Sequence, residues 1–97
     1  MSIRLVYKQI IKEEFLEEYL DIMKRILPSV RKQPGCINYQ VCQDMSNPLI
    51  ITCIEEWEKV EDVTAHGSHP DTIELAPKME SFFEKDSGEY SLYNVLV

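Results

Sequence analysis

The sequence predicts an α+β domain in which four strands form one antiparallel sheet and helices connect the first strand to the second and the third to the fourth. Three observations predict this arrangement. A long segment, Lys12 to Arg31, repeats apolar residues at helical spacing. Four other segments have the alternation or the apolar runs typical of strands, and a second helical stretch precedes the last of them. Residues 1–97 are expected to form a single domain, because one hydrophobic core is normal for a chain of 97 residues.

The first half of the chain supplies a strand, a helix and a second strand. Ile3 to Gln9 is rich in β-forming residues, and Lys12 to Arg31 has an apolar stripe opposite a charged one. Pro28 removes one backbone donor and should bend the last turn of this helix. The helix is predicted to stop at Gln33-Pro34-Gly35, and Cys36 to Gln43 then alternates as a strand. The residues expected on one face of that strand are Ile37, Tyr39 and Val41.

The second half supplies a strand, two helical segments and a last strand. Leu49 to Trp57 is apolar on both faces, and Lys59 to His66 is a short helix followed by a glycine. Ser68 is the predicted N-cap of the next helix. Tyr90 to Val97 forms the last strand and is again apolar on both faces. The order is therefore β-α-β-β-α-β, the split βαβ or ferredoxin-like arrangement, with its helices on one face of the sheet.

The two apolar strands imply that something covers the other face of the sheet. A sheet with helices on one side normally has a polar outer face, whereas Leu49 to Trp57 and Tyr90 to Val97 are apolar on both sides. An exposed apolar sheet favours aggregation. We therefore expect a homodimer that packs through its sheet faces, with a bound apolar ligand as the alternative cover.

Composition excludes several classes of partner. The net charge is −7, which disfavours nucleic acid and anionic membranes as partners. No apolar run is long enough to span a bilayer, and the first ten residues lack the pattern of a signal peptide. The three cysteines, Cys36, Cys42 and Cys53, lack CxxC spacing and fit reduced, buried thiols. These features predict a cytoplasmic protein.

Two stretches resemble a known family. QPGCINYQVCQD is followed by a hairpin, then by EEWEKVEDVTAH and a Ser/His/Pro cluster, and this succession resembles the antibiotic biosynthesis monooxygenase domain over almost the whole chain. The resemblance implies a dimeric α+β barrel with a pocket between the helices and the sheet of each subunit. It also implies an activity, since characterised members include cofactor-free oxygenases acting on phenols or quinols. Other members degrade haem or isomerise small metabolites.

Trp57 and His66 are the candidate catalytic residues. Trp57 ends a strand and fits either a core anchor or a pocket wall, and these interpretations are compatible. His66 ends the short helix, where an exposed imidazole is also common. The resemblance implies that the tryptophan lines the pocket and that the histidine acts as a base or ligand. As a base, His66 would take a phenolic proton so that the anion could reduce O₂.

Five further residues are candidates for the substrate pocket. Tyr7 and Tyr39 are aromatic strand residues, and Phe82 and Phe83 close the second long helix, with core positions as the alternative for all four. His69 lies in the capping turn. The family often has Ser-Pro-His where this chain has Ser-His-Pro, so the histidine is displaced by one position.

No cofactor or metal is expected. His66 and His69 have helical ligand spacing, but Gly67 lies between them and no third ligand is evident. The chain has no glycine-rich phosphate loop, which disfavours a nucleotide cofactor. Haem-degrading relatives add an Asn on the first strand, and this chain has none there, so haem degradation is disfavoured.

The favoured interpretation is a monooxygenase, an oxidoreductase that oxidises a small aromatic phenol or quinol with O₂. The alternatives are a dimeric ligand-binding or stress-response domain without turnover and a small-metabolite isomerase. The sequence names neither the substrate nor the role of His69.

Overall fold

The computed structural model describes all 97 residues, and its elements confirm the expected order. They are β1 (Ile3–Ile10), η1 (Glu13–Phe15), α1 (Leu16–Val30), β2 (Cys36–Gln43), β3 (Ile50–Trp57), α2 (Val60–Gly67), α3 (Pro70–Met79), η2 (Glu80–Phe82) and β4 (Glu89–Asn94). η1 and η2 are single turns of 3₁₀-helix at the start of α1 and the end of α3.

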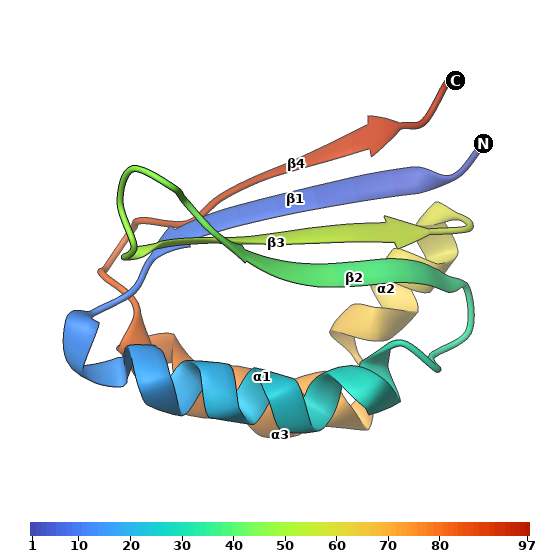
Figure 1. Ribbon diagram of the computed structural model, residues 1–97. Helices are drawn as coiled ribbons and strands as arrows, with labels where there is room; N and C mark the ends of the chain where they lie inside the picture. The colour runs from blue at the N-terminus through green and yellow to red at the C-terminus, as the bar shows by residue number, and fades with distance from the viewer.

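One antiparallel sheet and one layer of helices make up the domain. The strand order is β2-β3-β1-β4, so β1 pairs with β3 on one side and β4 on the other. Figure 1 shows α1 and α3 lying together below the sheet, with α2 near the end of β3. This is the α+β, ferredoxin-like class that the sequence predicts. None of the helices has the length and hydrophobicity needed to span a bilayer.

α1 packs on the sheet through one stripe of side chains. Tyr19, Met23, Leu27 and Val30 are its buried residues, at the spacing of one helical face. Pro28 lies inside the helix and on its exposed side. The helical hydrogen bonding continues past Pro28, because the Arg31 N–H donates to the Leu27 carbonyl at 2.9 Å.

The core lies between this stripe and the inner face of the sheet. Opposed strand residues share a face, so Ile3 and Trp57, which are paired, both point toward the helices. Eleven buried side chains form the core cluster, and Trp57 and Ile11 are fully buried within it. The cluster comprises Ile11, Tyr19, Met23, Leu27, Val30, Tyr39, Ile51, Cys53, Trp57, Phe82 and Phe83.

Two details of the sheet differ from expectation. The register of β2 on β3 shifts between Cys36 and Asn38, so Ile37 is an extra residue and is exposed instead of facing inward with Tyr39. The last strand is also shorter than predicted, because pairing with β1 ends at Asn94.

The outer face of the sheet carries both polar and hydrophobic side chains. Arg4 pairs with Glu56 there at 2.7 Å, and Thr52 and Ser91 add hydroxyl groups. Hydrophobic residues nevertheless remain exposed on the same face, with Tyr93 at 53%. The dimer stays a prediction.

Candidate functional site

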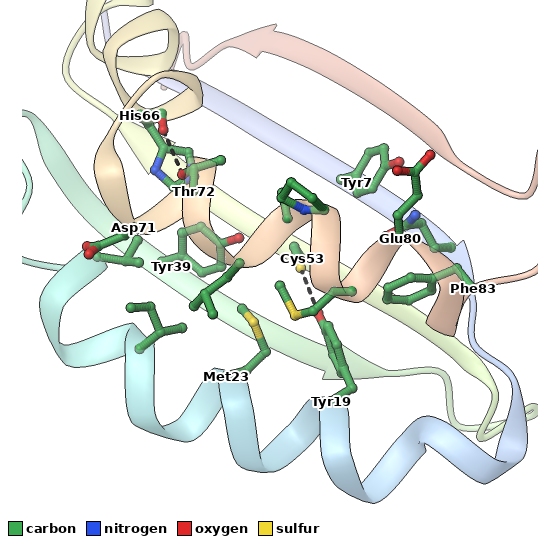
Figure 2. A pocket seen from close by; sticks show the side chains of 17 residues that line it. Tyr7, Tyr19, Met23, Tyr39, Cys53, His66, Asp71, Thr72, Glu80 and Phe83 are labelled. Carbon is green, nitrogen blue, oxygen red and sulfur yellow. Dashed lines mark hydrogen bonds between the residues drawn. The ribbon is translucent and has the colours of Figure 1, made fainter.

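A cavity of about 600 Å³ opens between α1, α3 and the inner face of the sheet. Eleven of its 17 lining residues are hydrophobic, and the lining contains neither lysine nor arginine. Figure 2 shows side chains entering it from the sheet, from α1 and from α3, with His66 and Asp71 toward one end and Tyr7 and Glu80 toward the other. A space of this size accommodates a small aromatic molecule.

The floor of the cavity carries two phenols and a thiol. The Tyr19 hydroxyl lies 3.6 Å from the Cys53 sulfur, and Tyr39 lies on the neighbouring strand. Burial raises the pKa of Cys53 and of Tyr39, and it raises that of Tyr19 as well. All three groups are therefore uncharged at neutral pH, which keeps the centre of the cavity apolar.

His66 is fixed at one end of the cavity by the turn that precedes β2. It lies in the last turn of α2, and its Nδ1 is 2.8 Å from Oε1 of the buried Gln33. The Thr72 hydroxyl donates to the His66 carbonyl at 2.7 Å, which ties the end of α2 to α3. Gln33 thus holds the imidazole ring, and Thr72 holds the backbone of His66.

The orientation of Gln33 determines the His66 tautomer. The Gln33 amide nitrogen donates to Oδ2 of Asp71 at 3.4 Å, and a carboxylate oxygen only accepts. The Gln33 oxygen must then face His66 and accept from Nδ1–H. Asp71 is itself held by the Ser29 hydroxyl at 2.8 Å. The lone pair of His66 is therefore on Nε2, the ring nitrogen without a hydrogen bond.

His66 is neutral at physiological pH. Its side chain is 16% exposed. Burial is the main cause that lowers its pKa. The nearby His69 lowers the pKa further, while the Asp71 carboxylate raises it. A neutral imidazole with a free Nε2 lone pair is a proton acceptor.

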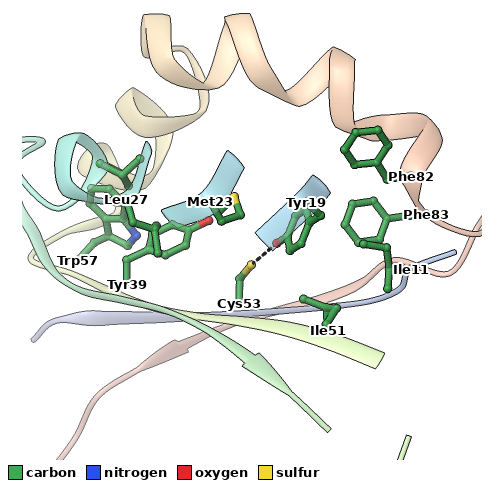
Figure 3. Close-up of a cluster of buried hydrophobic side chains, with 11 residues drawn as sticks. Ile11, Tyr19, Met23, Leu27, Tyr39, Ile51, Cys53, Trp57, Phe82 and Phe83 are labelled. Carbon is green, nitrogen blue, oxygen red and sulfur yellow. Dashed lines mark hydrogen bonds between the residues drawn. The ribbon is translucent and has the colours of Figure 1, made fainter. Parts of the chain in front are cut away.

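Behind His66 lies a buried pair, Glu55 and Trp57. The Trp57 indole Nε1 donates to Glu55 Oε1 at 3.0 Å, and the same oxygen lies 4.0 Å from His66 Nε2. The Trp57 and His66 rings lie 4.8 Å apart with 32° between their planes. Burial raises the pKa of Glu55 to about 7, while the Trp57 N–H and the Tyr39 hydroxyl oppose that rise. Figure 3 shows Trp57 packed between Leu27 and Tyr39 in the core.

The chain matches the model of a known family. Residues 1–76 match the family model described as antibiotic biosynthesis monooxygenase. The chain belongs to this family. Its membership confirms the resemblance seen in the sequence.

Individual relatives support the assignment. Protein SchA of Streptomyces halstedii is 28% identical over 95 residues, and a 42.8 kDa protein of the whiE locus of Streptomyces coelicolor is 31% identical over 75 residues. These stretches are 97% and 74% of this chain, which spans only 24% and 19% of those relatives' lengths. A conserved protein of Methanosarcina mazei Go1 superposes with a TM-score of 0.91 at 30% identity, covering 97% of this chain and 92% of that one.

Within this monooxygenase-family cavity, four of the predicted site residues line the wall. They are Tyr7, Tyr39, His66 and Phe83. Tyr39 and His66 meet edge to face, with ring centroids 5.9 Å apart. These four residues, one imidazole and three aromatic rings, were predicted from the sequence, and the structure brings them together around one cavity.

The other three predicted residues lie outside the lining. Trp57 is fully buried, and it adjoins the site by contacting His66 and Glu55. Phe82 points into the core and stacks on Phe15, with centroids 4.7 Å apart. His69 is the N-cap of α3, the role predicted for Ser68, because its Nδ1 accepts from the Asp71 N–H at 3.1 Å.

The His66–His69 pair does not form a ligand cluster. His69 uses Nδ1 for its capping bond, and His66 uses Nδ1 for Gln33. No group of three or more His, Cys, Asp or Glu side chains is gathered anywhere in a way that could hold a metal ion.

Two buried polar residues of the site, Gln33 and Glu55, escaped the sequence analysis. Glu55 could have been identified from the sequence, because it lies between Cys53 and Trp57 on the inward-facing positions of β3, where an acid is unusual. Gln33 could not, since it lies in a turn where polar residues are expected.

Proposed function

We propose that the protein is a cofactor-independent monooxygenase that oxidises a small aromatic phenol or quinol with O₂. The observation that carries the proposal is the free Nε2 of a neutral His66 at one end of an apolar, aromatic-lined cavity. Membership of the antibiotic biosynthesis monooxygenase family supports the reaction class.

The chemistry requires one base and an apolar chamber. His66 Nε2 removes the phenolic proton, which leaves an electron-rich phenolate. The phenolate transfers an electron to O₂, and the resulting radical pair combines to form a carbon–oxygen bond. The peroxide anion takes up the proton that His66 holds. Loss of water then gives the quinone, so phenol plus O₂ yields quinone plus water.

The charges in the cavity favour an uncharged substrate. Its lining carries the carboxylates of Asp71 and Glu80 and no basic residue to pair with a phosphate or carboxylate. The aromatic side chains of Tyr39 and Phe83 offer surfaces on which a flat ring packs. This disfavours phosphorylated metabolites and supports a neutral phenol or quinol.

The test is O₂ uptake with a panel of hydroquinones and anthrols. His66→Ala should lower kcat/KM by about 10²–10⁴-fold, the usual cost of losing a general base. Lys24→Ala is the control, because Lys24 lies on the exposed side of α1 and outside the cavity lining, and it should leave kcat/KM almost unchanged. Added imidazole should restore part of the activity of His66→Ala. Protein treated with a chelator should stay active.

Other outcomes separate the alternatives. Equal rates for wild type and His66→Ala would remove His66 from the mechanism. Product formed without O₂ would indicate an isomerase. A ligand that raises the melting temperature but yields no product would indicate a binding domain.

A further inference from the structure

Glu55 is a buried acid that no basic residue neutralises. The residue is 4% exposed, and the only ion-pair partner within 4.0 Å is the neutral His66. The Trp57 indole N–H donates a hydrogen bond to the Glu55 carboxylate at 3.0 Å. An acid in such surroundings is costly to keep ionised, and one indole donor only partly offsets that cost.

The same carboxylate faces the reactive nitrogen of His66. Oε1 of Glu55 lies 4.0 Å from Nε2, whereas Nδ1 on the opposite side of the ring is occupied by Gln33. This gap exceeds a hydrogen bond of about 3 Å, and such contacts commonly shorten when substrate binds. Glu55 is not part of the cavity lining, so it reaches the substrate only through His66.

We propose that Glu55 accepts, through His66, the proton that leaves the phenol, and returns it by the same route to the peroxide. This inference rests on the proposed monooxygenase function. The phenol oxygen gives its proton to Nε2 of His66. The imidazolium ring then turns so that the same Nε2–H faces Glu55, whose carboxylate accepts the proton and becomes a neutral acid. His66 is then neutral again, and no imidazolium has to persist in the cavity. The proton later protonates the peroxide oxygen that departs as water.

The groups around Glu55 are suited to this role because none of them competes for the proton near neutral pH. The titratable neighbours are Cys36 and Tyr39 from β2, Tyr19 from α1 and Cys53 from β3. Burial raises the pKa of each of these thiols and phenols, so they stay protonated. On the far side of His66 stand His69 and Asp71.

The proton affinity of Glu55 supports the exchange. Burial raises its pKa to about 7, close to the pH at which the enzyme would work. The lowered pKa of His66 means that the imidazole releases its proton readily. A proton store is most effective when its pKa lies near the working pH.

Infrared spectroscopy of the protein alone tests the acid directly. Wild type should show the C=O band of a buried carboxylic acid, which disappears as pH rises through neutrality and is absent from Glu55→Gln. His66→Gln should shift the midpoint of that band, because the imidazole no longer shares the proton. A Glu55 that is ionised throughout, or a midpoint unaffected by His66→Gln, would overturn the inference.

The pH profile of kcat/KM tests the role in turnover. Glu55→Gln keeps an oxygen acceptor for Trp57, and we expect about a 10–100-fold loss, as is typical when the partner of a functional histidine is removed. Its profile should lose the limb due to Glu55, and Glu55→Asp should restore that limb. A structural role alone would lower kcat/KM and leave the profile unchanged, which would overturn the inference. The infrared experiment needs neither substrate nor O₂, so an inactive wild type would count against the proposed function only.

Discussion

At the scale of single residues, the site depends on which atom of each polar side chain faces its neighbour. Asp71 orients the Gln33 amide, Gln33 assigns the proton to Nδ1 of His66, and Nε2 is left free. Glu55 on the other side is oriented by Trp57. Four buried or half-buried side chains thus prepare one lone pair, and only Trp57 among them is a candidate from the sequence.

Replacing the neutral acceptor of His66 by a charged one should change its basicity. In Gln33→Glu a carboxylate would face Nδ1, and an opposite charge this close favours the imidazolium, raising its pKa by about 1–3 units. NMR titration of the His66 ring measures the shift. Gln40→Glu, on the exposed outer face of β2, is the matched control and should leave the titration unchanged. An unaltered His66 pKa in Gln33→Glu would contradict the assigned contact.

Glu55 should make stability depend on pH. Its pKa is about 7 when folded and 4.5 as an ordinary carboxyl, so the folded state binds more protons between these values. The free energy of unfolding should therefore fall by about 3 kcal/mol as pH rises through that window. His66 acts oppositely, because its lowered pKa adds stability as pH rises toward its ordinary value of 6.5.

Denaturant titrations of wild type and Glu55→Gln at several pH values isolate the Glu55 contribution. The difference between the two proteins should grow in favour of Glu55→Gln as pH rises toward 7. A constant difference across that range would mean that Glu55 has an ordinary pKa.

At the scale of elements, regular patterns were predictable and irregular ones were not. The helical period of α1 and the alternation of β2 and β3 identify these elements, because each buries one face. Alternation cannot reveal an inserted residue, so Ile37 was assigned to the wrong face. Ser68 and His69 both precede a proline-led helix, and only the three-dimensional path of the turn decides which one caps it.

The turn before β2 tolerates only glycine at position 35. Gly35 has a φ of 81°, and a Cβ there would collide with the Asp62 carboxyl group from α2. Gly35→Ala should destabilise the fold by about 1–2 kcal/mol from the left-handed backbone alone, with the collision in addition. Thermal unfolding measures the loss.

A second glycine provides the control for that experiment. Gly67, at the end of α2, has no atom within 4 Å of the position that a Cβ would occupy. Gly67→Ala should be neutral or should stabilise the protein by up to about 1 kcal/mol, the usual helical preference for alanine. Equal destabilisation by both substitutions would contradict the described backbone of the turn.

At the scale of the whole molecule, the location of the cavity was predictable, but the contacts between its residues were not. The topology puts a pocket between α1, α3 and the sheet, and aromatic residues on inward positions line it. The Trp57 side chain also points inward, but it is large, it is fully buried in the core, and its indole donates to Glu55. Burial depth depends on how helices pack, which a single sequence does not contain.

The exposed hydrophobic residues of the sheet bear on assembly. Tyr93 on β4 is 53% exposed and lies on the outer face, where we expect a second copy to pack. Tyr93→Lys should shift the mass in light scattering from dimer to monomer, because Arg4 lies opposite on β1 and the added positive charge would be unpaired in the interface. Ile73→Glu on α3, at 61% exposure, is the control and should leave the mass unchanged. A monomeric wild type at micromolar concentration would refute the dimer.

The contact between Trp57 and His66 has one more consequence. Trp57 is the only tryptophan in the chain, and its indole lies against the imidazole and holds the Glu55 carboxyl group. Indole emission responds to charges and protons beside the ring. The tryptophan fluorescence of the unmodified protein therefore reports a single location, and it offers a label-free optical signal for ligand entry and proton movement on the timescale of a stopped-flow experiment.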